Sequence, residues 1–252
     1  MIHGDIIDID AYVKTYNTIW KAQPISLNIV YEDRYLLVIN KNSNCVVHPG
    51  NNNLENTVFN ALLYKYSFLR DVPRAGIIHR LDKDTTGLMI IAKNLMTYYL
   101  LKQLLKNHRI IRIYEAIVYN NIHTNQIINF PIKKKYINKK IKMFVHPQGI
   151  QAITKIFVQQ CLPNFTYLKV QLYTGRTHQI RVHLSYIKHS IIGDPLYKQH
   201  HKKNTFIQSI LQRQALHASY LEFYHPIYNF KINIKSDLPQ DIKNILHILQ
   251  KT

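Results

Sequence analysis

The chain has 252 residues, of which 46% are hydrophobic and 11% aromatic, so it can bury one or two sizeable cores and is not a disordered protein. Its 33 Lys and Arg residues against 14 Asp and Glu give a net charge of +19, more than solubility requires, which favours a polyanionic partner. No run approaches the ~18 consecutive apolar residues of a membrane-spanning helix, and the N-terminus has no signal-peptide core. We therefore expect a cytoplasmic protein that binds nucleic acid rather than a membrane.

Cysteine and histidine usage gives no sign of a metal or redox site. Cys45 and Cys161 are far apart and lack CxxC spacing, which argues against structural zinc and against a disulfide framework. Of the 14 histidines, His178 with His183 and the adjacent pair at 200–201 come nearest to ligand spacing, but neither pair has a carboxylate or cysteine partner at the right distance. We therefore expect no metal and no cofactor.

The hydrophobic periodicity predicts short strands interspersed with helices. In chain order we expect a hairpin over 27–39, a helix over 57–66, a buried strand over 87–92, a helix over 94–108, a strand over 111–118 and a basic loop. Then follow a strand over 165–173, a helix from about Thr177, strands over 215–224 and 230–235, and a terminal helix opened by Pro239. Because the strand segments mostly alternate apolar and polar residues, we expect an α+β fold with a largely antiparallel sheet.

Residues 72–92 form the most informative stretch of the sequence. Two apolar pieces, Ile77–Ile78 and Leu88–Ile91, enclose a polar turn bounded by Gly76 and Gly87. A turn held between buried strands presents its side chains rigidly at a surface cleft. We expect this turn to bring five side chains to one place, namely His79, Arg80, Asp82, Lys83 and Asp84.

The residues alone leave two other interpretations of this turn open. It could be an ordinary charged turn in which Asp82 or Asp84 caps backbone amides. Residues 82–86 also match the Asp-x-Asp-x-Thr loop of haloacid-dehalogenase-type phosphatases, which use magnesium. That loop follows an unbroken apolar strand and is accompanied by further carboxylates, whereas here a histidine and an arginine interrupt the strand and Gly193-Asp194 has no acidic neighbour.

The string His79-Arg-Leu-Asp-Lys-Asp-Thr-Thr-Gly87 resembles the signature of the RluA-type pseudouridine synthases. Further blocks resemble that family in the expected order, at residues 47–50, 72–75, 114–116, 174–183, 193–195 and 213–218. The resemblance covers nearly the whole chain and implies the pseudouridine synthase catalytic fold, a mainly antiparallel mixed sheet with flanking helices and a central active-site cleft. It also implies the isomerisation of specific uridines to pseudouridine in RNA, with large-subunit ribosomal RNA as the expected substrate.

The resemblance assigns three catalytic residues. Asp82 falls on the family's catalytic aspartate, Tyr114 matches its active-site tyrosine, and Arg181 matches the arginine that pairs with the aspartate. A carboxylate beside RNA needs a nearby cation to stay ionised. Arg181 can supply one from a helix that packs through Ile180 and Leu184, and a tyrosine ring can stack on an everted base while its hydroxyl relays a proton.

Other basic residues are candidates for contacts with the RNA backbone. Arg80 and Arg176 are expected to contact the everted nucleotide or the stack that it leaves. The basic loop over 133–142, which begins with Lys133, Lys134 and Lys135, is expected to bind phosphates, with a solvated charged loop as the alternative.

Family resemblance also predicts the domain organisation. Close relatives carry a small N-terminal RNA-binding domain, and here only about 25 residues precede the first expected catalytic strand, too few for such a module. We therefore expect residues 1–25 to be an N-terminal extension, the remnant of a lost RNA-binding domain, and residues 26–252 to be a monomeric catalytic domain.

Two functions compete with the isomerase. The first is a non-catalytic RNA-binding or ribosome-assembly factor that retains the fold, against which the intact Asp82, Tyr114 and Arg181 argue. The second is the magnesium-dependent phosphatase suggested by the paired aspartates of the turn.

Overall fold

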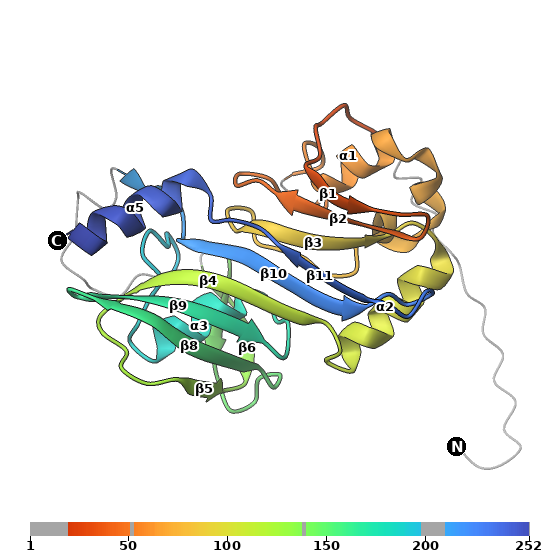
Figure 1. Ribbon diagram of the computed structural model, residues 1–252. Helices are drawn as coiled ribbons and strands as arrows, with labels where there is room; N and C mark the ends of the chain where they lie inside the picture. Colours follow the sequence, from red (N-terminus) through yellow and green to blue (C-terminus); the bar gives the residue numbers. More distant parts are fainter. Residues whose placement is uncertain (1–19, 51–52, 138–139, 198–209, 252) are drawn as a thin grey trace, which may run out of the picture.

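The computed structural model describes residues 20–50, 53–137, 140–197 and 210–251. The expected N-terminal extension therefore lies outside the described residues, apart from its last six positions, and so does the histidine pair at 200–201. One nine-stranded sheet runs the length of the molecule (Figure 1). Its strands follow the order β1-β2-β3-β10-β4-β9-β8-β5, with β11 paired beside β10.

The elements expected in the first part of the chain are confirmed. They are β1 (Ile29–Glu32), β2 (Leu36–Lys41), α1 (Val58–Lys65), β3 (Thr86–Ala92), α2 (Leu95–Lys106) and β4 (Ile111–Tyr119), with the short 3₁₀ segments η1 (Ser67–Asp71) and η2 (Pro73–Gly76) between α1 and β3. Each helix begins at a side chain that accepts a backbone N–H of the first turn, Thr57 for α1 and Asn94 for α2. Local capping chemistry therefore fixes where both helices start.

The second part of the chain supplies the other half of the sheet and two further helices. Its elements are β5 (Gln126–Asn129), β6 (Ile132–Ile137), β7 (Lys140–Val145), β8 (Ile153–Leu162), β9 (Phe165–Leu172), α3 (Gln179–Tyr186), β10 (Leu216–Tyr224), β11 (Lys231–Lys235) and α5 (Gln240–Lys251). Helix α5 buries Ile242, Ile245 and Leu249 on one side, as the spacing predicts.

The expected basic loop over 133–142 is wrong, because its described residues, 133–137 and 140–142, lie in strands β6 and β7, which pair antiparallel as a separate hairpin. The hairpin exists because two of its residues, Ile132 and Met143, are buried in a small cluster with Val182 of α3 and Tyr197. The lysines mask this sparse apolar pattern in the sequence. The hairpin therefore packs on the helix that carries Arg181.

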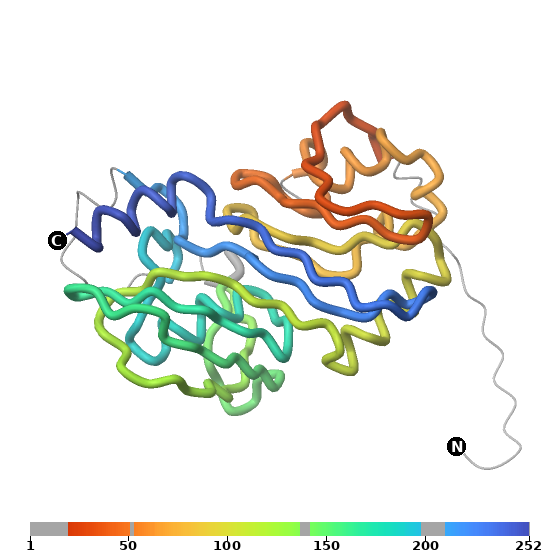
Figure 2. The backbone as a smooth tube through the Cα atoms, in the orientation of Figure 1, coloured from red at the N-terminus to blue at the C-terminus, as the bar shows by residue number. Residues whose placement is uncertain are grey.

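Strand β10 joins the two halves of the sheet although it lies near the end of the chain (Figure 2). It pairs in parallel with β3 through His217 and Ala218, and antiparallel with β4 and β11. All other strand pairs are antiparallel, so the expected sheet type is confirmed. Gly87 makes the parallel contact possible, because its φ is +114° and a Cβ there would lie 2.3 Å from the Ala218 carbonyl oxygen.

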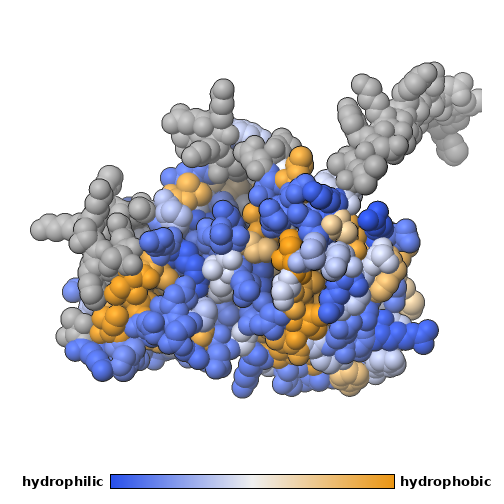
Figure 3. Space-filling model, turned by 90° about the horizontal axis from the view of Figure 1, so that it is seen from above, coloured by the Kyte–Doolittle hydropathy of each residue, from blue (hydrophilic) through white to orange (hydrophobic). Residues whose placement is uncertain are grey.

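The core lies on both faces of the central strands, and every residue of β3 is buried. The outer surface seen from above is largely hydrophilic, with apolar patches between the polar side chains (Figure 3). No helix in the described part of the chain is long and apolar enough to cross a membrane. The polar turn that precedes β3 thus starts from one of the most deeply buried parts of the molecule.

Candidate active site

Asp82 lies in the turn between the buried residues Ile77–Ile78 and β3. The turn is closed by a hydrogen bond of 3.1 Å from the Thr85 backbone N–H to the Asp82 carbonyl oxygen, and Leu81 anchors it in the core with 3% exposure. The carboxylate of Asp82 keeps 18% of its side-chain surface exposed. Leu81 and Thr85 therefore anchor the turn in the core, while the Asp82 carboxylate remains partly exposed.

Side chains from distant strands hold this turn from behind. The Lys41 ammonium donates to the carbonyl oxygens of Lys83, Asn42 and Cys45 at 2.9, 2.7 and 2.9 Å. Lys41 is only 3% exposed, and burial lowers its pKa to about 8 although neighbouring Asp and Cys charges oppose the change. All three donors of the ammonium are satisfied by backbone, so Lys41 fastens the turn to β2.

The residues that precede β10 fasten the other end of the turn. Arg213 donates to the Asp84 carbonyl oxygen at 3.1 Å and forms a bidentate pair with Asp241 of α5 at 2.7 and 2.8 Å. The Gln214 amide donates to the Thr85 hydroxyl at 3.0 Å. The turn that carries Asp82 is thus connected to both β10 and the terminal helix.

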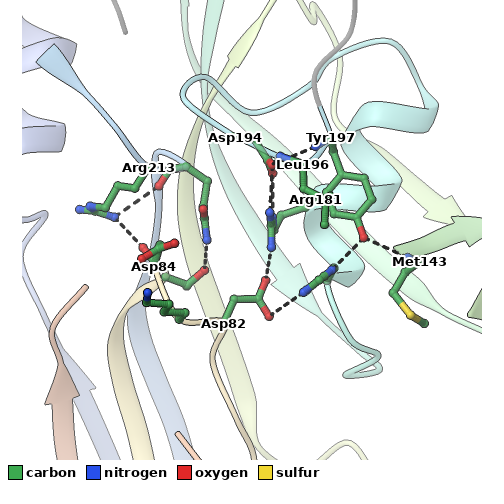
Figure 4. A network of polar contacts seen from close by, with 12 residues as sticks. Asp82, Asp84, Met143, Arg181, Asp194, Leu196, Tyr197 and Arg213 are labelled. Atoms are coloured by element: carbon green, nitrogen blue, oxygen red, sulfur yellow. Dashed lines mark hydrogen bonds and ion pairs between the residues drawn. The ribbon is translucent and has the colours of Figure 1, made fainter. Parts of the chain in front are cut away.

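Arg181 of α3 faces Asp82 and pairs with two carboxylates (Figure 4). Its Nη1 donates to Asp82 Oδ2 at 2.9 Å, while Nε and Nη2 donate to Asp194 Oδ2 and Oδ1 at 2.7 and 2.9 Å. Burial disfavours the charge, but the hydrogen bonds and charges of Asp194 and Asp82 outweigh it and raise the pKa of Arg181 above its usual value. Arg181 is therefore a fixed cation.

Asp194 orients Arg181 and is itself rigidly held. Its Oδ1 also accepts the backbone N–H groups of Leu196 and Tyr197 at 2.8 and 3.0 Å. Burial opposes its ionisation, but the hydrogen bonds and charge of Arg181 with these backbone donors lower the pKa of Asp194 below its ordinary value. Gly193 brings it into place, since with φ of +72° a Cβ there would lie 2.1 Å from the Arg213 carbonyl oxygen.

His178 lies on the second oxygen of Asp82. Its Nε2 is 3.8 Å from Asp82 Oδ1, and its Nδ1 is 2.8 Å from the Tyr197 hydroxyl, which also accepts the Met143 backbone N–H at 3.1 Å. The direction of the bond between Nδ1 and the hydroxyl depends on the tautomer of the ring: the tautomer that accepts the phenol proton at Nδ1 carries its own proton on Nε2, toward Asp82. Burial lowers the pKa of His178 despite the opposing charge of Asp82, so the ring is neutral near pH 7.

These groups surround a small cavity of about 50 Å³, which is little more than the volume of one or two water molecules. It is lined by Arg80, Leu81, Asp82, Thr85, Tyr114, Leu172, Arg176, His178, Gln179, Ile180, Arg181 and Leu216. Burial raises the pKa of Tyr114, and the charge of Asp82 adds to this against the opposing effect of Arg112. The phenol is therefore protonated at neutral pH.

The structure brings together five of the eight residues that the sequence analysis selected. Asp82, Tyr114, Arg181, Arg80 and Arg176 all line this cavity, and Arg80 and Arg176 are exposed at its rim. Lys133, Lys134 and Lys135 are exposed on β6 and do not line it.

The expectation that His79 joins Asp82 is wrong. Its Nε2 accepts the Ile90 backbone N–H at 3.1 Å, so the ring turns back toward β3. Burial and the charges of Arg112 and Lys102 lower the pKa of His79 to about 3. A neutral acceptor for a strand N–H is a structural role, which sequence adjacency to Asp82 does not reveal.

Sequence reasoning missed Asp194, Lys41 and Tyr197 as parts of the site. Asp194 lies in a block that resembles the family, but its sequence neighbours give no sign that it pairs with an arginine. The signal that could have found it is charge balance, because a buried arginine facing one carboxylate through one nitrogen leaves donors that need a second acceptor.

Comparisons with known proteins show the family to which the chain belongs. A family model described as RNA pseudouridylate synthase matches residues 35–186. The ribosomal large subunit pseudouridine synthase D of Buchnera aphidicola subsp. Acyrthosiphon pisum is 45% identical over 229 residues, which cover 88% of this chain and 73% of that protein. The protein of the same name from Yersinia pestis is 41% identical over 257 residues, covering 99% and 78% of the two chains.

Two human structures share the fold. RNA Pseudouridylate Synthase Domain Containing 4 superimposes with a TM-score of 0.69 at 24% identity, covering 88% of this chain and 92% of that one. RNA Pseudouridylate Synthase Domain Containing 1 gives a TM-score of 0.64 at 22% identity, covering 90% and 96%. With a family model that spans more than half of its residues, the chain belongs to the RNA pseudouridylate synthase family and is an isomerase.

Proposed function

We propose that the chain converts specific uridines of large-subunit ribosomal RNA to pseudouridine, with Asp82 as the catalytic carboxylate. The observation that carries this proposal is the contact of 2.9 Å between Asp82 and Arg181 at the cavity, in a chain of this family. The substrate is proposed from the relatives, which are named ribosomal large subunit pseudouridine synthase D. This chain aligns with 73% and 78% of the length of the two relatives. The net charge of +19 fits a polyanionic substrate.

The reaction is an internal rearrangement. The bond from C1′ to N1 of the uracil breaks, the base turns, a bond from C1′ to C5 forms, and the proton of C5 is lost while N1 gains one. Atoms and electrons balance without an oxidant or an energy source. Whether the carboxylate attacks the sugar, attacks the base or assists glycal formation, each route needs an ionised carboxylate at the glycosidic bond.

The charges around Asp82 suit this requirement. Asp82, Asp194 and Arg181 together carry one net negative charge, and Asp194 takes two of the three hydrogen bonds of the guanidinium. Asp82 receives one bond on Oδ2, while Oδ1 lies beyond hydrogen-bond range of His178 at 3.8 Å. In our proposal Arg181 holds the carboxylate through Oδ2, and Oδ1 is the oxygen that meets the substrate.

The target nucleotide must leave its stack before it reaches Asp82, at a cost of a few kcal/mol. A cavity of about 50 Å³ is too small for uracil, so we propose that Arg80 and Arg176 swing away from the rim when the base enters. Arg176 is held there by a single hydrogen bond of 3.1 Å from Nε to the Gln151 carbonyl oxygen. Tyr114 then stacks on the base, and the two arginines contact the phosphates of the RNA backbone on either side of that nucleotide.

The remaining parts of the proposal concern the setting. We propose that residues 26–252 act as one catalytic unit, since a single sheet joins strands from β1 to β11, and that this unit acts as a monomer. Lys133, Lys134 and Lys135 on the β6–β7 hairpin bind the RNA backbone beyond the cavity. The ribosomal substrate implies action in the cytoplasm.

The test is to incubate the purified protein with large-subunit ribosomal RNA, free or in assembly precursors, and to map pseudouridine at nucleotide resolution. Conversion at defined uridines by wild type is expected. RNA binding without conversion would replace the isomerase with an assembly factor, and magnesium-dependent phosphate release would point to the phosphatase. Conversion in other RNAs alone would leave the chemistry standing and overturn the ribosomal substrate.

A further inference from the structure

Three arginines are buried in the described part of the chain, and only Arg112 among these three has no carboxylate partner. Arg181 and Arg213 each form a bidentate pair with an aspartate, at 2.7 to 2.9 Å. Arg112 is 5% exposed, as buried as Arg181. Within the described residues its Nε has no hydrogen-bond partner, and Nη2 reaches only the Leu172 carbonyl oxygen at 3.5 Å.

An unpaired buried guanidinium is costly. Burial lowers the pKa of Arg112, and the only opposing influence is the hydroxyl of Tyr114. Removing a charge from water without a hydrogen-bonded counterion destabilises the folded state. The described part of the fold therefore maintains a buried cation at Arg112 and provides no carboxylate partner for it.

The position of Arg112 indicates what the counterion is. Arg112 and Tyr114 are two residues apart on β4 and both are buried, so they share the face of the strand on which Tyr114 lines the cavity. The guanidinium lies directly beneath Gly175, where a Cβ would come within 2.9 Å of Nη1. Gly175 is exposed and adjoins Arg176 at the cavity rim, so this residue leaves open an approach from solvent to the guanidinium.

We propose that Arg112 binds a phosphate of the substrate RNA beside the everted uridine, an inference that rests on the proposed function. A phosphodiester presents two non-bridging oxygens that share one negative charge, and a guanidinium fork can bind both of them at once. Arg80 and Arg176, at the rim of the same cavity, extend the positive surface along which the backbone would run. Binding of the phosphate supplies the buried Arg112 guanidinium with a counterion.

The test compares Arg112→Met with wild type in thermal unfolding and in RNA binding as a function of salt. Methionine keeps much of the volume and removes the unpaired charge, so the variant should unfold at the same temperature as wild type or higher. Its affinity for a large-subunit ribosomal RNA transcript should fall about tenfold or more. Arg109→Met is the matched control, because Arg109 is exposed beside a different cavity and its loss changes net charge equally.

A second variant keeps the charge and blocks the approach. Gly175→Ala places a methyl group against Nη1 from the exposed side, and Gly175 has no positive φ that would strain alanine. It should weaken RNA binding while Arg112 remains. If Arg112→Met unfolds at a lower temperature and binds RNA like wild type, or if Gly175→Ala binds RNA like wild type, Arg112 is a packing residue and the inference is overturned.

These outcomes are separate from those of the proposed function. Pseudouridine formation by wild type is measured first on the same transcript. Absence of conversion refutes the isomerase, whereas the binding of RNA phosphates at Arg112 is still read from affinity. Conversion by wild type together with unchanged affinity of Arg112→Met refutes only the phosphate site.

Discussion

Replacement of Asp194 by asparagine separates the orientation of Arg181 from the chemistry of Asp82. Asp194 is 2% exposed and accepts four hydrogen bonds, two of them from Arg181. Removal of one partner from a buried ion pair costs about 3–5 kcal/mol, and for a chain of this size that corresponds to a loss of about 6–20 °C in Tm. Because Asp194 does not line the cavity, kcat should fall much more than the affinity for RNA.

Thermal unfolding by circular dichroism and single-turnover pseudouridine formation measure the two effects. Asp241→Asn is a matched control, since Asp241 also pairs with an arginine in bidentate fashion but keeps 38% of its side chain exposed, so about 1 kcal/mol or less is expected. The folded-state pKa of Asp194 is lowered from its ordinary 3.8, so its contribution is complete above that pH and is lost as the pH falls below it. The difference in stability between wild type and Asp194→Asn should therefore narrow only below about pH 4. A free energy of unfolding within about 0.5 kcal/mol of wild type, together with an unchanged kcat, would refute the role of Asp194 in holding Arg181.

Three further predictions concern the support of the site and the RNA. Tyr197→Phe removes the acceptor of the Met143 N–H and the hydrogen-bond partner of His178. The free energy of unfolding should fall by about 1–3 kcal/mol and kcat several-fold, with little change in RNA affinity. An unchanged kcat in single-turnover assays contradicts the proposed orientation of His178. Burial lowers the pKa of Lys41 from 10.5 to about 8, so on raising the pH the folded state releases this proton before the unfolded state does. The free energy of unfolding of wild type should therefore rise by about 3 kcal/mol relative to Lys41→Met between pH 8 and 10.5. A difference in urea unfolding that does not change with pH would show that the pKa of Lys41 is not lowered. Replacement of Lys133, Lys134 and Lys135 by glutamine should reduce the slope of the logarithm of the RNA association constant against the logarithm of salt concentration by roughly 2. A loss of turnover at saturating RNA would instead place these lysines in the chemical step.

Most elements of the fold could be predicted from the sequence because their signals are local. The hairpin β1–β2, the capped helices α1 and α2, and the alternating strand β9 each follow from periodicity or capping over a few residues. The order of the sheet could not be predicted. The insertion of β10 between β3 and β4 depends on a close approach at Gly87 to a residue more than a hundred positions away.

The site shows the same division between local and long-range information. The turn that presents Asp82 can be predicted from the apolar residues before and after it, and the helix that presents Arg181 from the apolar face formed by Ile180 and Leu184. The second carboxylate on Arg181, the ammonium of Lys41 beneath the turn and the inward rotation of His79 all depend on contacts between distant segments. The β6–β7 hairpin is hard to predict because lysines interrupt its apolar residues, and its burial depends on contacts of Ile132 and Met143 with Val182 and Tyr197.

The most direct measurement of the central claim is single-turnover formation of pseudouridine in large-subunit ribosomal RNA by Asp82→Asn and by Asp84→Asn. Both substitutions remove one carboxylate from the same turn, but only Asp82 lines the cavity and contacts Arg181. We predict that Asp82→Asn binds the RNA and forms no pseudouridine, while Asp84→Asn converts the same uridines as wild type. Pseudouridine formation by Asp82→Asn at the wild-type rate would contradict the assignment of this carboxylate as the catalytic group.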